Sequence, residues 1–176
     1  MFKYRISKYN PKFRNKEGVY TRNEWTAYSD IGEKFDDGIL TETKYLKVEK
    51  FYIDFIYSFF KSQDISSVRI VGQEPEKIFQ KTTFEIGDDW LFTIIQKEIR
   101  EQFWCKFKAE DFELYMGDDF YLHIDSKINV EKEINEMAKK YNLYFEVLWF
   151  AQNQRIKIRK STFCSNYTKY KQRILS

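Results

Sequence analysis

The residues that decide the fold read FWCKFKAEDFELYMGDDFYLHI and occupy positions 103–124. Apolar and polar residues alternate in three short runs, which is typical of half-buried strands. The runs are separated by only three residues each, 109–111 and 117–119, which favours hairpins. The stretch therefore predicts an antiparallel meander over 103–108, 112–116 and 120–124. Its inward-facing residues are predicted to be Phe103, Cys105, Phe107, Phe112, Leu114, Met116, Phe120, Leu122 and Ile124.

Helices are predicted on both sides of this meander in the sequence. Thr41 is a good N-cap for a long amphipathic helix over 42–62. Asp88 caps a second helix, with Asp89 in its first turn, and Asn129 caps a third over 130–141. Further strands are expected at 2–9, 19–28, 66–71, 81–86, 144–150 and 155–159. We therefore predict an α+β fold, with an antiparallel or mixed sheet, a central strand meander and about three helices packed on it.

The chain has 176 residues, which suits a single domain over 1–176. Its net charge of +3 is unevenly distributed. Seven Lys and Arg residues and no Asp or Glu lie in 155–176, whereas 1–154 holds 23 basic and 27 acidic residues. The sequence therefore predicts a mildly acidic body with a basic C-terminal strand and tail.

Several functional classes find no support in the sequence. No apolar run is long enough to span a membrane, and no signal peptide is visible, so we expect a cytoplasmic protein. Phosphate loops and dinucleotide fingerprints are absent, and a lone histidine with scattered carboxylates has no metal-ligand spacing. We expect no cofactor and no metal.

His123 is the one side chain that suggests catalysis. Together with Asp125 it forms half of a general-base pair, and a nuclease would still need a cation such as Lys106. An exposed histidine on the face of a sheet explains the same pattern more simply. We therefore expect no enzymatic activity.

Adjacent acidic residues recur at predicted turns and helix starts, at 36–37, 88–89, 110–111 and 118–119. Each pair is explained by a solvated turn, and some of them together would form an acidic surface for a basic partner. The basic C-terminal end supports an alternative: Arg155, Lys157 and Arg159, followed by Tyr167 and Tyr170, suit single-stranded nucleic acid.

Several stretches of the chain are similar to one group of small bacterial proteins: YRISKYNP (4–11), NEWTAYSDIG (23–32), YLKVE (45–49), FWCK (103–106) and GDDFYL (117–122). In these stretches the chain resembles the immunity proteins of bacterial toxin systems, including contact-dependent growth inhibition. The resemblance implies tight, one-to-one binding of a cognate toxin domain in the cytoplasm, without enzymatic activity. The partner would be a nuclease domain at the C-terminal end of a large secreted effector.

The partner-binding residues are predicted from exposure and chemistry, because the resemblance carries no contact residue. Asp118 and Asp119 are the first choice, since a hairpin tip reaches into a cleft. Asp88 and Asp89 are the second acidic pair. The chain is 19% aromatic, and surplus aromatic residues anchor interfaces, so Trp25 and Tyr115 are the predicted anchors.

Overall fold

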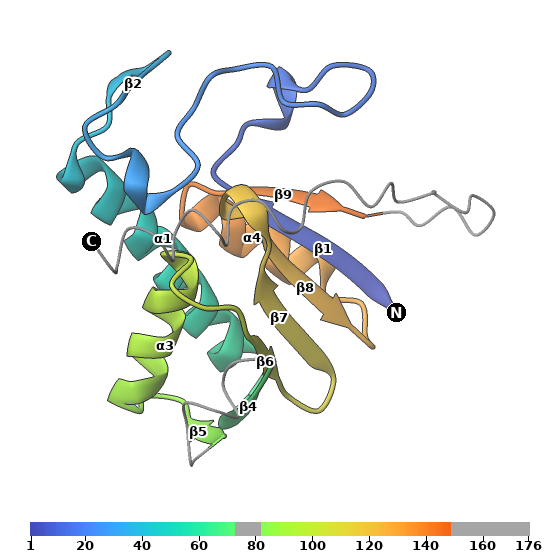
Figure 1. Cartoon of the computed structure of the whole chain (residues 1–176). Helices are drawn as coiled ribbons and strands as arrows, with labels where there is room; N and C mark the ends of the chain where they lie inside the picture. Colours follow the sequence, from blue (N-terminus) through green and yellow to red (C-terminus); the bar gives the residue numbers. More distant parts are fainter. Residues whose placement is uncertain (73–81, 149–176) are drawn as a thin grey trace.

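A computed structural model describes residues 1–72 and 82–148 of the chain (Figure 1). They form a seven-stranded sheet in the order β5-β4-β6-β7-β8-β1-β9, and all its pairings are antiparallel. Its strands are β1 (Phe2–Ser7), β4 (Ser67–Val71), β5 (Thr83–Glu85), β6 (Lys106–Lys108), β7 (Phe112–Met116), β8 (Leu122–Ser126) and β9 (Tyr144–Val147). A small separate hairpin pairs β2 (Lys34–Phe35) with β3 (Gly38–Ile39). The predicted α+β fold and its meander are confirmed.

Three α-helices accompany the sheet in the described residues: α1 (Glu42–Ser62), α3 (Asp89–Ile99) and α4 (Glu131–Lys140). The predicted caps explain where two of them begin. The Thr41 hydroxyl accepts from the Lys44 backbone N–H, and the Asp88 carboxylate accepts from the Trp90 N–H. Both bonds satisfy backbone donors that have no partner within the helix.

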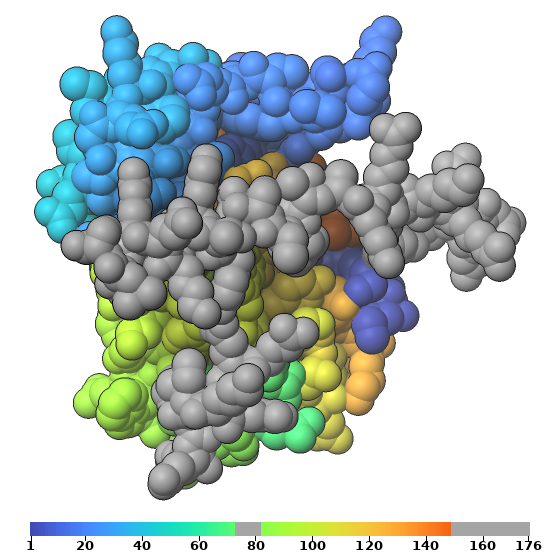
Figure 2. Space-filling model, in the orientation of Figure 1, coloured from blue at the N-terminus to red at the C-terminus, as the bar shows by residue number. Residues whose placement is uncertain are grey.

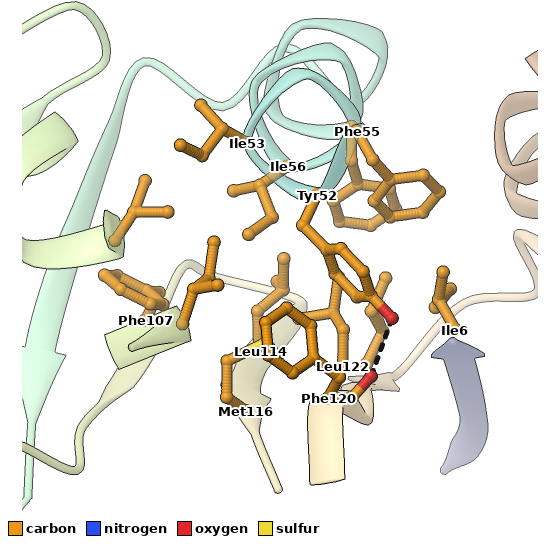
Figure 3. Packing of buried hydrophobic residues seen from close by; sticks show 14 of the residues in the cluster. Ile6, Tyr52, Ile53, Phe55, Ile56, Phe107, Leu114, Met116, Phe120 and Leu122 are labelled. Carbon is orange, nitrogen blue, oxygen red and sulfur yellow. Dashed lines mark hydrogen bonds between the residues drawn. The ribbon is translucent and has the colours of Figure 1, made fainter. Parts of the chain in front are cut away.

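One layer of helices covers one face of the sheet, and the core lies between the two layers (Figures 1 and 3). All nine meander residues predicted to face inward are buried, as proposed from their alternation. Aromatic and aliphatic side chains of α1, among them Tyr52, Phe55 and Ile56, pack against them. The other face of the sheet carries no helix in the described part of the chain, and polar side chains cover it.

Two predicted strands differ from the structure. Residues 19–28 form no strand apart from an isolated bridge between Arg14 and Tyr20, because Trp25 turns into the core and the chain then enters a 3₁₀ turn, Tyr28–Asp30. The third meander strand begins at Leu122 rather than Phe120, because the turn before it takes up a 3₁₀ turn, η3 (Asp118–Phe120).

Other predicted positions shift less. Strand β6 begins at Lys106 rather than Phe103, and Phe2 is 41% exposed at the free start of β1. The predicted strand 155–159 and the basic tail lie outside the described residues, so the nucleic-acid alternative that depends on them stays a prediction.

A long connection, residues 8–41, lies over the end of the sheet where β1 ends and β8 begins (Figures 1 and 2). It contains two 3₁₀ turns, Pro11–Phe13 and Tyr28–Asp30, besides the β2–β3 hairpin. Trp25 ties it to the core, with its ring 5.4 Å from that of Tyr45 and 5.1 Å from that of Phe120. This connection and the β7–β8 turn therefore form one end of the molecule.

Candidate functional site

The turn between β7 and β8 has a strained backbone. Asp119 adopts φ 58° and ψ 40°, and Phe120 adopts φ 61°, so two consecutive non-glycine residues lie in the left-handed region. Such a conformation costs about 1–3 kcal/mol for a bulky side chain such as Phe120, and Asp119 adopts it more readily. Hydrogen bonds close the turn, from the Gly117 N–H to the Tyr121 carbonyl (2.7 Å) and from the Tyr121 N–H to the Asp118 carbonyl (3.3 Å).

Burial of Phe120 holds this turn in place. The ring is 1% exposed and lies edge-on to Trp25, Tyr45 and Tyr52, at centroid distances of 5.1, 5.7 and 5.5 Å. Each such aromatic pair contributes about 0.5–1.5 kcal/mol beyond the burial of area. The Tyr52 hydroxyl also donates to the Phe120 carbonyl at 2.7 Å (Figure 3). These contacts offset the backbone strain and fix the direction in which the turn presents its acids.

Four carboxylates gather around this turn from separate segments, and we call them the acidic end: Asp30, Glu101, Asp118 and Asp119. Burial raises the pKa of Asp119, and the charges of Asp118 and Asp30 raise it further. Partial desolvation, followed by the charges of Asp119, Asp118 and Asp30, raises the pKa of Glu101 to about 7. The four groups therefore lie close enough to repel one another.

Few of these acids are neutralised within the described structure. One oxygen of Asp30 accepts from the backbone N–H groups of Thr26 and Ala27. Within residues 1–72 and 82–148, no hydrogen bond or ion pair involves the carboxylates of Glu101, Asp118 or Asp119. The acidic end therefore presents negative charge that the described part of the chain does not pair.

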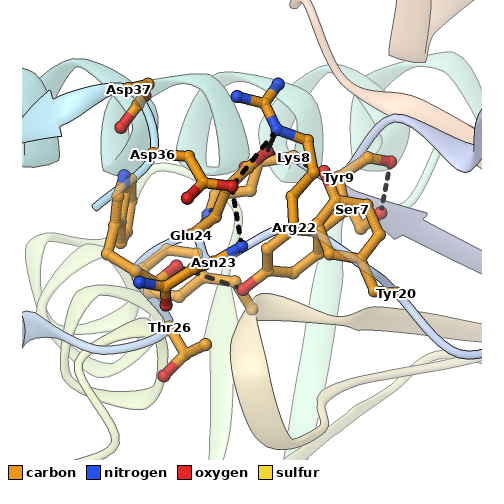
Figure 4. Close-up of polar contacts among 12 residues, drawn as sticks. Ser7, Lys8, Tyr9, Tyr20, Arg22, Asn23, Glu24, Thr26, Asp36 and Asp37 are labelled. Carbon is orange, nitrogen blue, oxygen red and sulfur yellow. Dashed lines mark hydrogen bonds and ion pairs between the residues drawn. The ribbon is translucent and has the colours of Figure 1, made fainter. Parts of the chain in front are cut away.

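A cleft of about 170 Å³ adjoins the acidic end, and we call it the tyrosine cleft. The rings of three tyrosines line it: Tyr9 lies 5.0 Å from Tyr20 and 5.3 Å from Tyr121, centroid to centroid. Asp119 and Glu24 contribute carboxylates to the same lining. The Tyr20 hydroxyl donates to Glu24 at 2.7 Å (Figure 4), so that carboxylate is oriented.

Two cations at the cleft, Lys8 and Arg22, form ion pairs with acids other than Asp119, and the charge of Lys8 also lowers the pKa of Asp119. The Nζ of Lys8 lies 3.6 Å from Glu24 and 4.0 Å from the ring centres of both Tyr9 and Trp25. Burial lowers the pKa of Lys8 to about 8, and the Glu24 charge opposes that shift. Arg22 also lines the cleft, and its Nε lies 3.7 Å from Asp36 (Figure 4) and 4.0 Å from Glu24. Asp119 is therefore the carboxylate of the cleft that forms no ion pair in the described residues.

The face of the sheet that carries no helix in the described residues, which we call the open face, is organised differently. Its centre is a row across the strands in which the rings of Tyr115 and His123 stack at 5.0 Å, with Lys106 4.7 Å from the Tyr115 ring centre. Ion pairs join its other charges: Glu113 with Lys106 and Lys108, Asp125 with Lys3, and Glu146 with Arg5 and Arg14. Each of these carboxylates has a cation partner.

His123 belongs to this open face. Burial and the neighbouring charge of Arg5 lower its pKa, and Asp125 opposes them only in part. In the described residues no hydrogen bond joins His123 to Asp125, whose carboxylate accepts instead from Lys3. The geometry therefore gives His123 a packing role against Tyr115 and Gly117.

The predicted partner-binding residues fall in four places, one of which is the core. Asp118 and Asp119 lie at the acidic end, and Tyr115 lies half-buried on the open face. Asp88 and Asp89 lie at the start of α3, whereas Glu101 follows its end, about 16 Å away along the helix axis. The two acidic pairs therefore do not share one patch.

Trp25 requires a correction. Its side chain is 3% exposed and packs between Tyr45 and Phe120, because burying so large a ring stabilises the long connection on the core. Its carbonyl accepts from the Tyr9 hydroxyl. Trp25 therefore packs under the β7–β8 turn as a core residue, and it is not a surface anchor.

The sequence reasoning missed several residues of the site: Tyr9, Tyr20, Asp30, Glu101 and Tyr121. They come from segments that alternate poorly or lie at the ends of elements, and only the folded chain brings them together. For Glu101 the sequence offered only its position after a predicted helix, where the chain often adopts a left-handed conformation. In the structure Glu101 has a φ of 56°.

Comparison of the chain with protein-family models, with curated proteins and with solved structures gives no match. In the described residues, no group of three or more histidine, cysteine or acidic side chains is placed to hold a metal ion. No helix in those same ranges is both long and apolar enough to cross a bilayer.

Proposed function

We propose that this protein is an immunity protein that binds and neutralises a cognate bacterial toxin domain in the cytoplasm through its acidic end, and that it is not an enzyme. The toxin is a nuclease domain, whose surface is basic because it must bind phosphate. The observation that carries the proposal is a strained turn that presents acids unpaired in the described residues. Backbone strain that the surrounding structure over-determines is a feature of functional sites.

The electrostatics give a reason for the arrangement. Like charges held close together destabilise the free protein, and a basic partner relieves that repulsion when it binds. Exposed acids also steer a basic partner during encounter and fix its orientation, more than they add to affinity. We expect a one-to-one complex of standard size, burying roughly 1,600 Å² in total.

Co-expression tests the proposal. The toxin domain encoded beside this gene is induced with and without the protein, and growth and co-purification are measured. We expect growth to be restored and a one-to-one complex to be recovered. Cell death despite ample soluble protein, with no complex, would refute the immunity function.

A matched pair of variants tests the surface. Asp118→Asn with Asp119→Asn removes two charges at the acidic end and keeps the side-chain shape, and Asn tolerates the left-handed backbone at 119. Glu110→Gln with Asp111→Asn removes two charges at the opposite end of β7. We expect the first pair to slow association at least tenfold at low salt, and the second to change it less than twofold. Equal effects would contradict the acidic end as the contact surface.

A further inference from the structure

We propose that the tyrosine cleft accepts one lysine or arginine side chain of the protein partner, with the Asp119 carboxylate as its counter-charge. This inference rests on the proposed function and names how the partner is held. The cleft volume of about 170 Å³ equals that of roughly six water molecules, which is the size of one side chain rather than of a peptide or a nucleotide.

The rings of the cleft favour a cation. Aromatic faces carry negative charge density and attract ammonium and guanidinium groups within about 6 Å. The chain already places its own cations against the same tyrosines: Lys8 is 4.0 Å from the Tyr9 ring centre, and the Arg14 guanidinium is 5.6 Å from that of Tyr121. The Arg14 guanidinium also lies 5.8 Å from the ring centre of Tyr20, so each of the three rings has a cation near it.

The charge balance of the lining also selects a cation. Lys8 and Arg22, which lines the cleft, are ion-paired with Glu24 and Asp36. Asp119 forms no ion pair in the described residues, and the charge of Lys8 acts on it only from a distance. The charges of Asp118 and Asp30 add to that of Asp119. An anionic group would be repelled by this surplus, and an apolar side chain would desolvate the carboxylate without pairing it. A lysine or arginine satisfies both the rings and the acid.

Peptide titration of the free protein tests the inference without the toxin. The probes are acetyl-Gly-Lys-Gly-amide and acetyl-Gly-Arg-Gly-amide, with acetyl-Gly-Gln-Gly-amide and the norleucine analogue as neutral controls. Tyrosine-ring resonances are followed by NMR. We expect saturable shifts of the Tyr9, Tyr20 and Tyr121 rings with millimolar affinity for the cationic peptides, and at least fivefold weaker binding of both controls.

Two variants locate the binding. Asp119→Asn is expected to weaken binding of the cationic peptides at least fivefold, and Tyr20→Leu to do the same by removing one wall of the cleft. Glu110→Gln, at the opposite end of β7, is expected to leave the affinity within twofold. Equal binding of the neutral peptides, no saturable shift at 100 mM peptide, or unchanged affinity in Asp119→Asn would overturn the inference.

The two proposals fail separately. Growth protection in the co-expression experiment without peptide binding would leave the immunity function standing and remove the cleft as the cation site. Peptide binding without growth protection would support the cleft and refute the toxin as its partner.

Discussion

The open face and the acidic end are both rich in charged side chains, but the two surfaces differ in whether these side chains form ion pairs. On the open face, Glu113, Asp125 and Glu146 each contact a cation on a neighbouring strand or on the long connection. At the acidic end, Glu101, Asp118 and Asp119 have no such contact in the described residues, and their charges act on one another. The charges of the first arrangement are paired within the chain, whereas those of the second would be paired by the basic partner that we propose.

This difference concerns how the charges are paired rather than how many charges each surface carries. Paired exposed charges contribute roughly 0–1 kcal/mol each and leave little field beyond the surface. Unpaired like charges cost stability and project a field that a partner of opposite sign senses. The backbone supports the same distinction, because the strained turn lies at the acidic end and the strands of the open face are regular.

The largest expected effect concerns the buried ring that holds the acidic end. Phe120→Ala should lower the free energy of unfolding by about 3–5 kcal/mol, since it removes a fully buried aromatic ring and leaves a cavity. Tyr115→Ala on the half-buried open face should cost far less. Denaturant unfolding monitored by circular dichroism compares the two. Equal losses would mean that the acidic end is no more dependent on the core than the open face.

A pH effect is expected from Glu98, which anchors the strand that leads into the turn. It is fully buried and accepts from the Met116 N–H at 3.1 Å and from the Cys105 thiol at 3.3 Å. Burial raises its pKa from 4.5 to about 8. The folded protein therefore keeps a proton that the unfolded chain loses, so stability should fall as pH rises from about 4.5 and level off above about 8.

Glu98→Gln is the matched variant for this effect, because it keeps the shape and cannot ionise. Its free energy of unfolding should vary less between pH 5 and pH 8 than that of the natural chain, by a margin on the order of a few kcal/mol. Urea titrations across that window measure it. Parallel pH profiles for the two proteins would show that Glu98 does not carry the effect.

An intermediate effect is expected where the two regions meet. A Cβ added at Gly117 would lie 2.9 Å from Nε2 and 3.1 Å from Cδ2 of His123, so the ring must move. Gly117→Ala should therefore cost about 1–3 kcal/mol and disturb the Tyr115–His123 stack, which ring-current shifts of His123 would report. Gly87→Ala is no control, since its φ of +105° is itself strained. Tyr115→Phe keeps the stack and is the suitable control.

The smallest effect is the most direct test of the comparison. Asp118→Asn with Asp119→Asn should raise the melting temperature of the free protein by about 1–3 °C at low salt, because repulsion at the surface is worth less than about 1 kcal/mol. Glu113→Gln should lower it slightly, because two lysines lose their partner. Scanning calorimetry at 20 mM and 500 mM salt resolves both. Shifts of the same sign would break the distinction between the regions.

Much of the fold could be predicted from the sequence because local patterns specified it. The meander alternation placed all nine inward residues correctly, and the caps Thr41 and Asp88 located two helix starts. The segment 19–28 was predicted wrongly because the Trp25 side chain is buried in the core by long-range packing and does not follow the alternation of a strand. Tyr9, Tyr20 and Glu101 could not be assigned to the site, since their proximity to the β7–β8 turn depends on long-range packing.

The left-handed backbone at residue 119 limits how this surface can change over time. Asp, Asn and Gly fit that conformation readily, whereas other side chains carry a steric penalty there. A single substitution can therefore keep or remove the charge at this position, but reversal of the charge to Lys or Arg costs folding energy. Residue 118 has no such restriction. The fold therefore restricts the choice of side chain at residue 119 much more than at residue 118.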